Sequence, residues 1–242
     1  MFPISDENPT ELRPVMTVAL ILVNVYAWFQ LQGAGTEHAL QASAMHFGAI
    51  PCEITGVCAV EGLGNGAILT SMFMHGSWEH IIGNMLFLWV FGNNIEDSMG
   101  HLRFLAFYLL CGAVATAAHI WFNLGDAVPV VGASGAISGV MGAYIVLYPH
   151  ARVRTWFPPI FLFHIRAMFF LAYWFLLQVA MATIDFGSEA GDGGGVAVWA
   201  HVGGFVAGVV LVKLFENHAL TQARRAKIQL TPGQVAQARP WL

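Results

Sequence analysis

Charged residues are scarce in this chain. They occupy only 10% of its 242 positions, whereas hydrophobic residues occupy 57%, and the mean hydropathy is +0.64. A water-soluble globule of this composition would have too little polar surface to cover itself. We therefore expect an integral membrane protein whose main solvent is lipid. The net charge of −4 gives no reason to expect nucleic acid as a partner.

Cysteine is also scarce, with three residues in the whole chain. Cys52 and Cys58 lie in the long segment after the first apolar run, and they can pair if that segment faces an oxidising compartment. Their six-residue spacing leaves the paired and unpaired alternatives open. Cys111 lies within an apolar run, where we expect ordinary packing.

Six apolar runs are long enough to cross a bilayer, which takes roughly 17 to 25 residues. They lie near Val15–Leu31, Trp78–Ile95, Leu102–Phe122, Val130–Tyr148, Ala167–Ile184 and Val196–Phe215. Polar residues and glycines interrupt the second and fourth runs, which are the weakest by hydropathy. Backbone groups in lipid need internal partners, so the runs should be helices. The predicted fold is all-α, a polytopic bundle of six transmembrane helices.

Lys and Arg are absent from the first, third and fifth connections between these runs. All ten basic residues lie on the other side, which predicts a multi-pass protein with both termini in the cytoplasm. No cleavable signal peptide is evident, because residues 1–14 are polar and acidic. We expect a membrane core over residues 1–217 and a polar cytoplasmic tail over residues 218–242. The expected location is the cytoplasmic (inner) membrane of a bacterium.

One of the apolar runs contains the glycine-rich sequence GASGAISG, Gly132–Gly139, with Ser134 near its start. Small residues at four-residue spacing are common in membrane helices, where they allow close packing, and a lone GxxSG is more often of that kind. Here glycines surround Ser134 where a loop becomes a helix. The first turn of a helix has unpaired N–H groups, which would stabilise an oxyanion formed at this serine.

His201 lies in the last apolar run, within Ala200–Gly204. A single histidine on an apolar helix is more often a hydrogen-bonded core residue than a base. However, Gly204 and Gly208 form a GxxxG face that would bring this helix close to another, within reach of Ser134. Desolvation favours the neutral imidazole, which can then take the proton of the serine hydroxyl. Ser134 and His201 therefore predict a hydrolytic pair inside a bilayer.

His80 and Asn84 lie four residues apart and share one helix face at the same outer depth. Both side chains can donate hydrogen bonds, which suits the stabilisation of an oxyanion. The alternative is a polar cap on the second run. A metal site formed by His75, Glu79 and His80 is not favoured, because the spacing is not HExxH and no third ligand is obvious.

Together these motifs resemble the rhomboid intramembrane serine proteases, and the resemblance covers about Phe47 to Gly208. Its parts are FGAIP at Phe47–Pro51, HIIGN at His80–Asn84, Glu96, GASGAISG at Gly132–Gly139 and AHVGGFVAG at Ala200–Gly208. Each part is weak alone, but their order and placement on the predicted spans are highly specific.

The resemblance implies a Ser–His dyad without a third carboxylate, in which Ser134 is the nucleophile and His201 the general base. It also implies an oxyanion hole from the Ser134 N–H with the side chains of His80 and Asn84. Some relatives carry an aromatic residue four positions after the nucleophile, stacked on the histidine, where this chain has Ser138. His201 must then be oriented by helix packing or by another side chain.

Some relatives also carry a Trp-Arg pair in the first outer loop, but residues 33–77 lack it. The resemblance therefore leaves the anchoring of that loop open. We expect an endopeptidase that cuts single-span membrane proteins near the outer face, needing no cofactor and no metal. An inactive membrane-protein binding factor would be expected to lose the serine or the histidine, but this chain has both Ser134 and His201. A transporter would need coupling-ion residues and an internal repeat.

Overall fold

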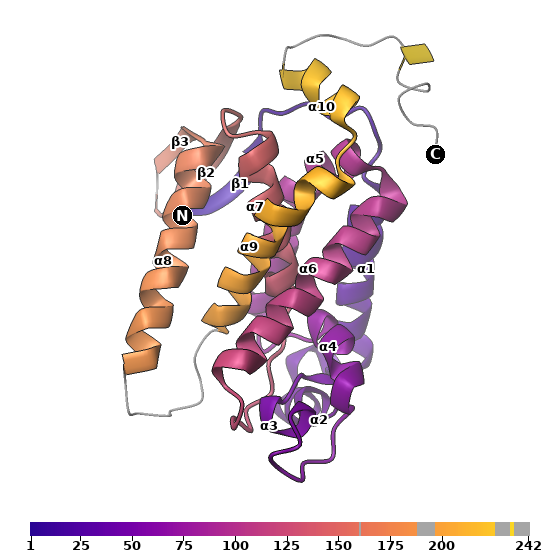
Figure 1. Cartoon of the computed structure of the whole chain (residues 1–242), viewed down its shortest axis with the longest axis vertical. Helices are drawn as coiled ribbons and strands as arrows, with labels where there is room; N and C mark the ends of the chain where they lie inside the picture. Colours follow the sequence, from indigo (N-terminus) through magenta and orange to yellow (C-terminus); the bar gives the residue numbers. More distant parts are fainter. Residues whose placement is uncertain (160, 188–196, 226–232, 235–242) are drawn as a thin grey trace.

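The computed structural model describes residues 1–159, 161–187, 197–225 and 233–234, and its long helices lie side by side in a bundle (Figure 1). The first half contains β1 (Phe2–Asp6), α1 (Val15–Gln30), η1 (Gly33–Gly35), α2 (Glu37–Phe47), α3 (Pro51–Ile54), η2 (Gly64–Gly66), α4 (Ala67–Thr70), η3 (Ser71–Phe73), α5 (Trp78–Met99) and α6 (His101–Phe122). The second half contains α7 (Ser134–Leu147), β2 (Arg152–Phe157), β3 (Phe161–Arg166), α8 (Ala167–Gly187), α9 (Val198–Phe215) and α10 (His218–Arg225).

Six helices, α1 and α5 to α9, occupy the places of the six predicted apolar runs. Within the described residues, α6 and α9 are long and apolar enough to cross a membrane, whereas α1, α7 and the Ala167–Thr183 part of α8 are shorter apolar helices. Two of the six predicted spans thus meet this criterion. Helix α7 falls short because it has only 14 residues, whereas the polar residues noted in the sequence lower the hydropathy of α5.

Helices α7 and α9 approach so closely that their backbones touch. A Cβ atom added at Gly208 would overlap the carbonyl oxygen of Gly139, and one added at Gly204 would overlap that of Gly135. Only glycine allows this separation, because any side chain would have to occupy the space of a neighbouring peptide group. The predicted GxxxG face of α9 therefore packs against the glycine-rich stretch that begins at Ser134.

The carboxyl end of α5 holds the start of α1. Glu96 is fully buried, and its carboxylate accepts hydrogen bonds from the backbone N–H groups of Met16 and Thr17, each at 2.8 Å, and from the Thr17 hydroxyl at 2.7 Å. These N–H groups belong to the first turn of α1, where the helix has no internal acceptors for them. The imidazole of His101 also contacts Glu96. The buried carboxylate is thereby fully engaged.

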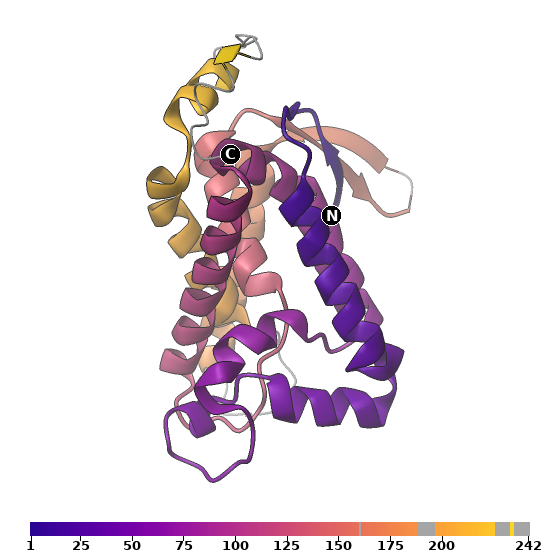
Figure 2. The ribbon, with the colours of Figure 1, turned by 90° about the vertical axis from the view of Figure 1, so that its right-hand side faces the viewer.

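A three-stranded antiparallel sheet, in the order β1-β2-β3, lies at one end of the bundle and extends sideways from it (Figure 2). The prediction of an all-α fold was wrong in this respect. In β2, Val153 and Thr155 are buried while Arg152 and Arg154 are exposed, the alternation expected of a half-buried strand. The partner β1 comes from the other end of the sequence, with Phe2 opposite Trp156.

The connection after α1 is fixed to the segment that precedes Ser134. Ala49, in the FGAIP motif, exchanges two backbone hydrogen bonds with Val130, at 3.0 and 2.9 Å. The N–H of Gly132 donates to the carbonyl of Ser71 at 2.9 Å. These contacts anchor the loop without a Trp-Arg pair. Cys52 and Cys58 form a disulfide within it, so the paired alternative holds in this structure.

The tail predicted from residue 218 begins with helix α10, in which Leu220 and Thr221 are buried. Contacts of α10 with α5 hold it against the core. Most of the rest of the predicted tail lies outside the described residues. The division between the two parts at residue 217 remains a prediction.

Candidate catalytic site

The site is built where α5, α7 and α9 begin. Ser134 is the first residue of α7, and His201 lies in the first turn of α9, which begins at Val198. His80 lies in the first turn of α5, and Asn84 lies one turn further on. The predicted start of the sixth run, Val196, lies outside the described residues. The structure brings all four predicted site residues to the same end of the bundle.

Ser134 and His201 are in direct contact. The Nε2 atom of His201 lies 2.8 Å from the Oγ atom of Ser134, and His201 is only 8% exposed. The close packing of α7 on α9 sets this distance, because Gly135 and Gly204 lie one residue beyond Ser134 and three beyond His201. This is the separation that a hydroxyl nucleophile and its base require.

The imidazole of His80 faces the loop before Ser134. A Cβ atom added at Gly132 would lie 2.7 Å from His80 Nε2 and 3.5 Å from Ser134 Oγ. Gly132 has φ +128°, a conformation that side chains with a Cβ rarely adopt, so glycine is required here for two reasons. The other ring nitrogen of His80 accepts a hydrogen bond from the Gly76 N–H at 3.3 Å. In the neutral ring the proton then resides on Nε2, beside the serine.

Two further kinds of hydrogen-bond donor lie at this end of the bundle. The side-chain nitrogen of Asn84 is buried and, among the residues that the structure describes, has no hydrogen-bond partner. An unpaired buried amide is costly, which suggests a partner present only during function. Because α7 begins at Ser134, the N–H groups of its first turn have no acceptor within the helix. The role of these groups as oxyanion donors stays a prediction.

A second histidine, His75, packs against the ring of His80. The ring of His75 is 5.1 Å from that of His80, and burial together with the neighbouring His80 lowers the pKa of His75 to about 3. The amide of Gln32 holds its backbone on both sides, donating to the His75 carbonyl at 2.7 Å and accepting from its N–H at 2.8 Å. The two hydrogen bonds of Gln32 thereby fix the segment just before α5 to the end of α1.

Two residues of α8 contact His201 and were not predicted from the sequence. The Oε1 atom of Gln178 lies 2.8 Å from His201 Nδ1, and the ring of Trp174 lies 5.6 Å from the imidazole. Ser138 is not available for this purpose, because its hydroxyl donates to the Ser134 carbonyl at 2.6 Å. The signal that was missed is a single amide in the apolar sequence FLLQVA, since a polar side chain in a membrane helix needs a partner.

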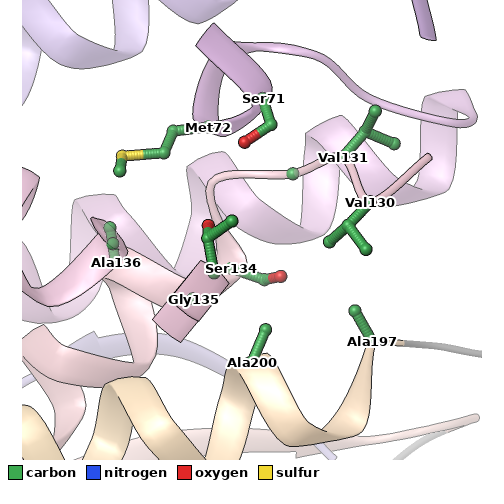
Figure 3. A pocket seen from close by; sticks show the side chains of 12 residues that line it. Ser71, Met72, Val130, Val131, Ser134, Gly135, Ala136, Ala197 and Ala200 are labelled. Atoms are coloured by element: carbon green, nitrogen blue, oxygen red, sulfur yellow. The ribbon is translucent and has the colours of Figure 1, made fainter. Parts of the chain in front are cut away.

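A small pocket adjoins Ser134, between the Ser71–Met72 segment and the start of α9 (Figure 3). Its lining is made of short or flexible side chains. They are Ser71, Met72, Gly112, Thr116, Val130, Val131, Gly132, Ser134, Gly135, Ala136, Ala197 and Ala200. The pocket is small, and Ser134 itself forms part of its wall.

The fold and site define a helical protein with a serine hydroxyl hydrogen-bonded to a buried histidine. The chain belongs to the rhomboid family, whose Rhomboid domain model matches residues 66–217. Members of this family are generally intramembrane serine proteases. The membrane location expected from composition is therefore supported by the family as well as by the apolar helices.

Curated relatives are similar over part of their length. Rhomboid protein 1, mitochondrial, of Saccharomyces cerevisiae is 29% identical over 67% of this chain and 45% of its own. Presenilin-associated rhomboid-like protein, mitochondrial, of Bos taurus is 36% identical over 40% of this chain and 26% of its own. Rhomboid-like protein 11, chloroplastic, of Arabidopsis thaliana is 32% identical over 33% of this chain and 28% of its own. These names refer to organelles, so they do not support the expected bacterial inner membrane.

Proposed function

We propose that this protein is an intramembrane serine endopeptidase with Ser134 as nucleophile and His201 as general base. The observation that carries the proposal is the 2.8 Å contact between Ser134 Oγ and His201 Nε2, made between two helices at one end of the bundle. Supporting it are the family membership, the imidazole of His80 against Gly132 and the N–H groups at the start of α7, which have no acceptor within the helix.

The chemistry follows from these positions. His201 Nε2 takes the hydroxyl proton as Ser134 Oγ attacks the peptide carbonyl carbon, and the carbonyl oxygen becomes an oxyanion. The Ser134 N–H, His80 Nε2–H and Asn84 Nδ2–H stabilise that charge. The imidazolium then donates its proton to the leaving amine, which breaks the peptide bond. Water, activated by the same imidazole, hydrolyses the acyl-enzyme and restores the hydroxyl.

The proposed substrates are single-span membrane proteins that contain a small residue at the scissile bond. The small pocket beside Ser134 supports that preference. A regular helix buries its carbonyls in i to i−4 hydrogen bonds, so cleavable segments should contain helix-weakening residues. Replacement of those residues by Leu in a reporter should abolish cleavage, and unchanged cleavage would contradict this substrate class.

We further propose that all six long helices span the bilayer and that the Ser134 end lies opposite the basic end. Arg152, Arg154 and Arg166 all belong to the sheet region, which lies at the other end of the bundle from α2 and α3 (Figure 1). Cytoplasmic connections are enriched in basic residues. The site would then open to water on the outer side, which acyl-enzyme hydrolysis requires.

The test uses the full chain in detergent and in lipid vesicles. A fluorophosphonate probe should label the wild-type protein, and a single-span reporter should be cleaved. Ser134→Ala and His201→Ala should lose both activities while keeping normal thermal stability. Ser98→Ala, near the carboxyl end of α5 and away from His80 and Asn84, is the matched serine-to-alanine control and should keep both activities. Cleavage that persists in Ser134→Ala would overturn the proposal.

A further inference from the structure

Helix α8 contributes a buried amide to the imidazole of His201. Gln178 is only 7% exposed, whereas its neighbours Leu176 and Leu177 are exposed. Burial of an unpaired amide in apolar surroundings is costly, so the position demands a hydrogen-bond partner. That partner is His201 Nδ1, 2.8 Å from Gln178 Oε1, in a hydrogen bond between two buried side chains.

We propose that Gln178 is the positioning residue that sets the tautomer of His201, an inference that rests on the proposed function. A neutral imidazole carries one proton, and a carbonyl oxygen can only accept. The contact with Gln178 Oε1 therefore places that proton on Nδ1. Nε2 is left with its lone pair directed at Ser134 Oγ, 2.8 Å away. The hydroxyl must then donate to the imidazole, which is the direction that nucleophilic attack requires.

Trp174 lies one turn before Gln178 on the same face of α8. Its ring is 5.6 Å from the imidazole with an interplanar angle of 44°, and it stacks on Phe205 of α9 at 6.3 Å. The ring thereby limits rotation of the imidazole out of the plane that faces Ser134. Helix α8 thus performs the orientation that an aromatic residue at position 138 would provide in other family members.

Among the described residues, the groups that interact with His201 electrostatically or contact its ring nitrogens include no carboxylate. The titratable groups that interact electrostatically with it within the described residues are His80 on α5 and His119 on α6, both imidazoles. The contact at Nδ1 is an amide on α8, and the contact at Nε2 is a hydroxyl on α7. A carboxylate introduced at position 178 should therefore add a negative charge next to the imidazole of the Ser134–His201 pair and strongly favour the imidazolium.

Three variants of the full chain test the proposal. Gln178→Met keeps the length of the side chain but removes the acceptor, Gln178→Glu keeps an acceptor, and Leu177→Met makes a similar change at the adjacent, exposed position. Each is measured for kcat, KM and the pH profile of kcat with the single-span reporter. The imidazole nitrogens are also observed by NMR in protein labelled with ¹⁵N-histidine, with His201 assigned by comparison with His201→Ala.

Gln178→Met should lower kcat roughly 10- to 100-fold with little change in KM, because the wrong tautomer becomes populated. Gln178→Glu should recover most of the loss at alkaline pH and shift the acidic limb of its profile to higher pH, since a carboxylate stabilises the imidazolium. Leu177→Met should behave as wild type. NMR should show the proton on Nδ1 in the wild-type protein and a tautomer mixture in Gln178→Met.

The proposal is overturned if Gln178→Met keeps the wild-type kcat, if Met and Glu reduce kcat equally, or if the acidic limb does not move. It is also overturned if NMR shows the proton on Nε2. Cleavage by Ser134→Ala would instead refute the proposed function, and the NMR result would still decide which nitrogen of His201 carries the proton. The two failures are therefore distinguishable.

Discussion

Gly208 of α9 lies directly against the carbonyl group of Gly139 on α7, so that the two helices touch through their backbones. Gly208→Leu should therefore separate the helices, destabilise the protein by about 1–3 kcal/mol and reduce cleavage because Ser134 and His201 move apart. Thermal unfolding in detergent and the reporter assay measure the two effects. Val206→Leu, at an exposed position of the same helix, should leave both unchanged. Equal stability of the two variants would contradict the close packing.

Glu96 should be essential for stability although it is remote from Ser134. Glu96→Leu removes the acceptor for the first turn of α1 and leaves buried N–H groups unpaired, so we expect a loss of about 2–4 kcal/mol in the free energy of unfolding. Thermal or denaturant unfolding measures this loss. Glu61→Leu, at an exposed loop position, should change stability by less than about 0.5 kcal/mol. A mild effect at Glu96 would mean that α1 is held by other contacts.

Asn84→Ala should lower kcat by about 10²- to 10³-fold with little effect on KM, since the amide would interact with the oxyanion only in the transition state. The reporter assay measures both constants. Asn65→Ala, in an exposed part of the connection before α5, is the matched amide control. A change confined to KM would assign Asn84 to substrate binding instead.

Gly112→Ala should narrow the preference at the scissile bond. An added Cβ atom there would press on the Met72 sulfur, and both residues line the pocket beside Ser134. Cleavage after alanine should fall roughly tenfold relative to cleavage after glycine. Met72→Ala should have the opposite effect and allow larger residues. Unaltered selectivity in both variants would show that this pocket does not receive the residue at the scissile bond.

Asp6 should make the sheet end of the protein sensitive to pH. Burial raises the pKa of its carboxyl group from 3.8 to about 6, although Tyr144 and Asn94 donate hydrogen bonds to it. Between these values the folded state binds a proton that the unfolded state has lost, so the contribution of Asp6 to stability should be fully present below pH 3.8 and be lost as the pH rises through about 6.

The measurement for Asp6 is the unfolding midpoint, or hydrogen exchange in β1, between pH 4 and pH 7. Asp6→Asn should remove this part of the pH dependence, because the amide does not titrate. Glu7→Gln, at the exposed adjacent position, should retain it. A wild-type dependence in Asp6→Asn would assign the pH effect to another group.

The sequence was informative where one physical constraint acts along a short stretch. Apolar length located the six long helices, and the glycine spacing indicated that the helix of Ser134 would pack against that of His201. Both features depend on residues within a few turns of each other. The spacing of His80 and Asn84 similarly predicted a shared helix face, because residues four apart in a helix are neighbours on its surface.

Apart from the Ser134–His201 pair, for which glycines mark both helices, contacts between distant segments were not predicted. The alternation in β2 is present in the sequence, but its partner β1 lies at the other end of the chain, and nothing local indicates the pairing. Gln178 likewise looks like an isolated polar residue until α8 is placed beside α9. The anchoring of Ala49 to Val130 uses only backbone atoms, which leave no side-chain pattern to read.

The pairing of β1 with β2 also bears on how the protein is made. Phe2 leaves the ribosome before its partner Trp156, which emerges only after α1, α5, α6 and α7 have been translated. The first strand must therefore stay without this partner while four helices are synthesised. Closure of the sheet therefore comes after the synthesis of the helices that carry His80, Asn84 and Ser134.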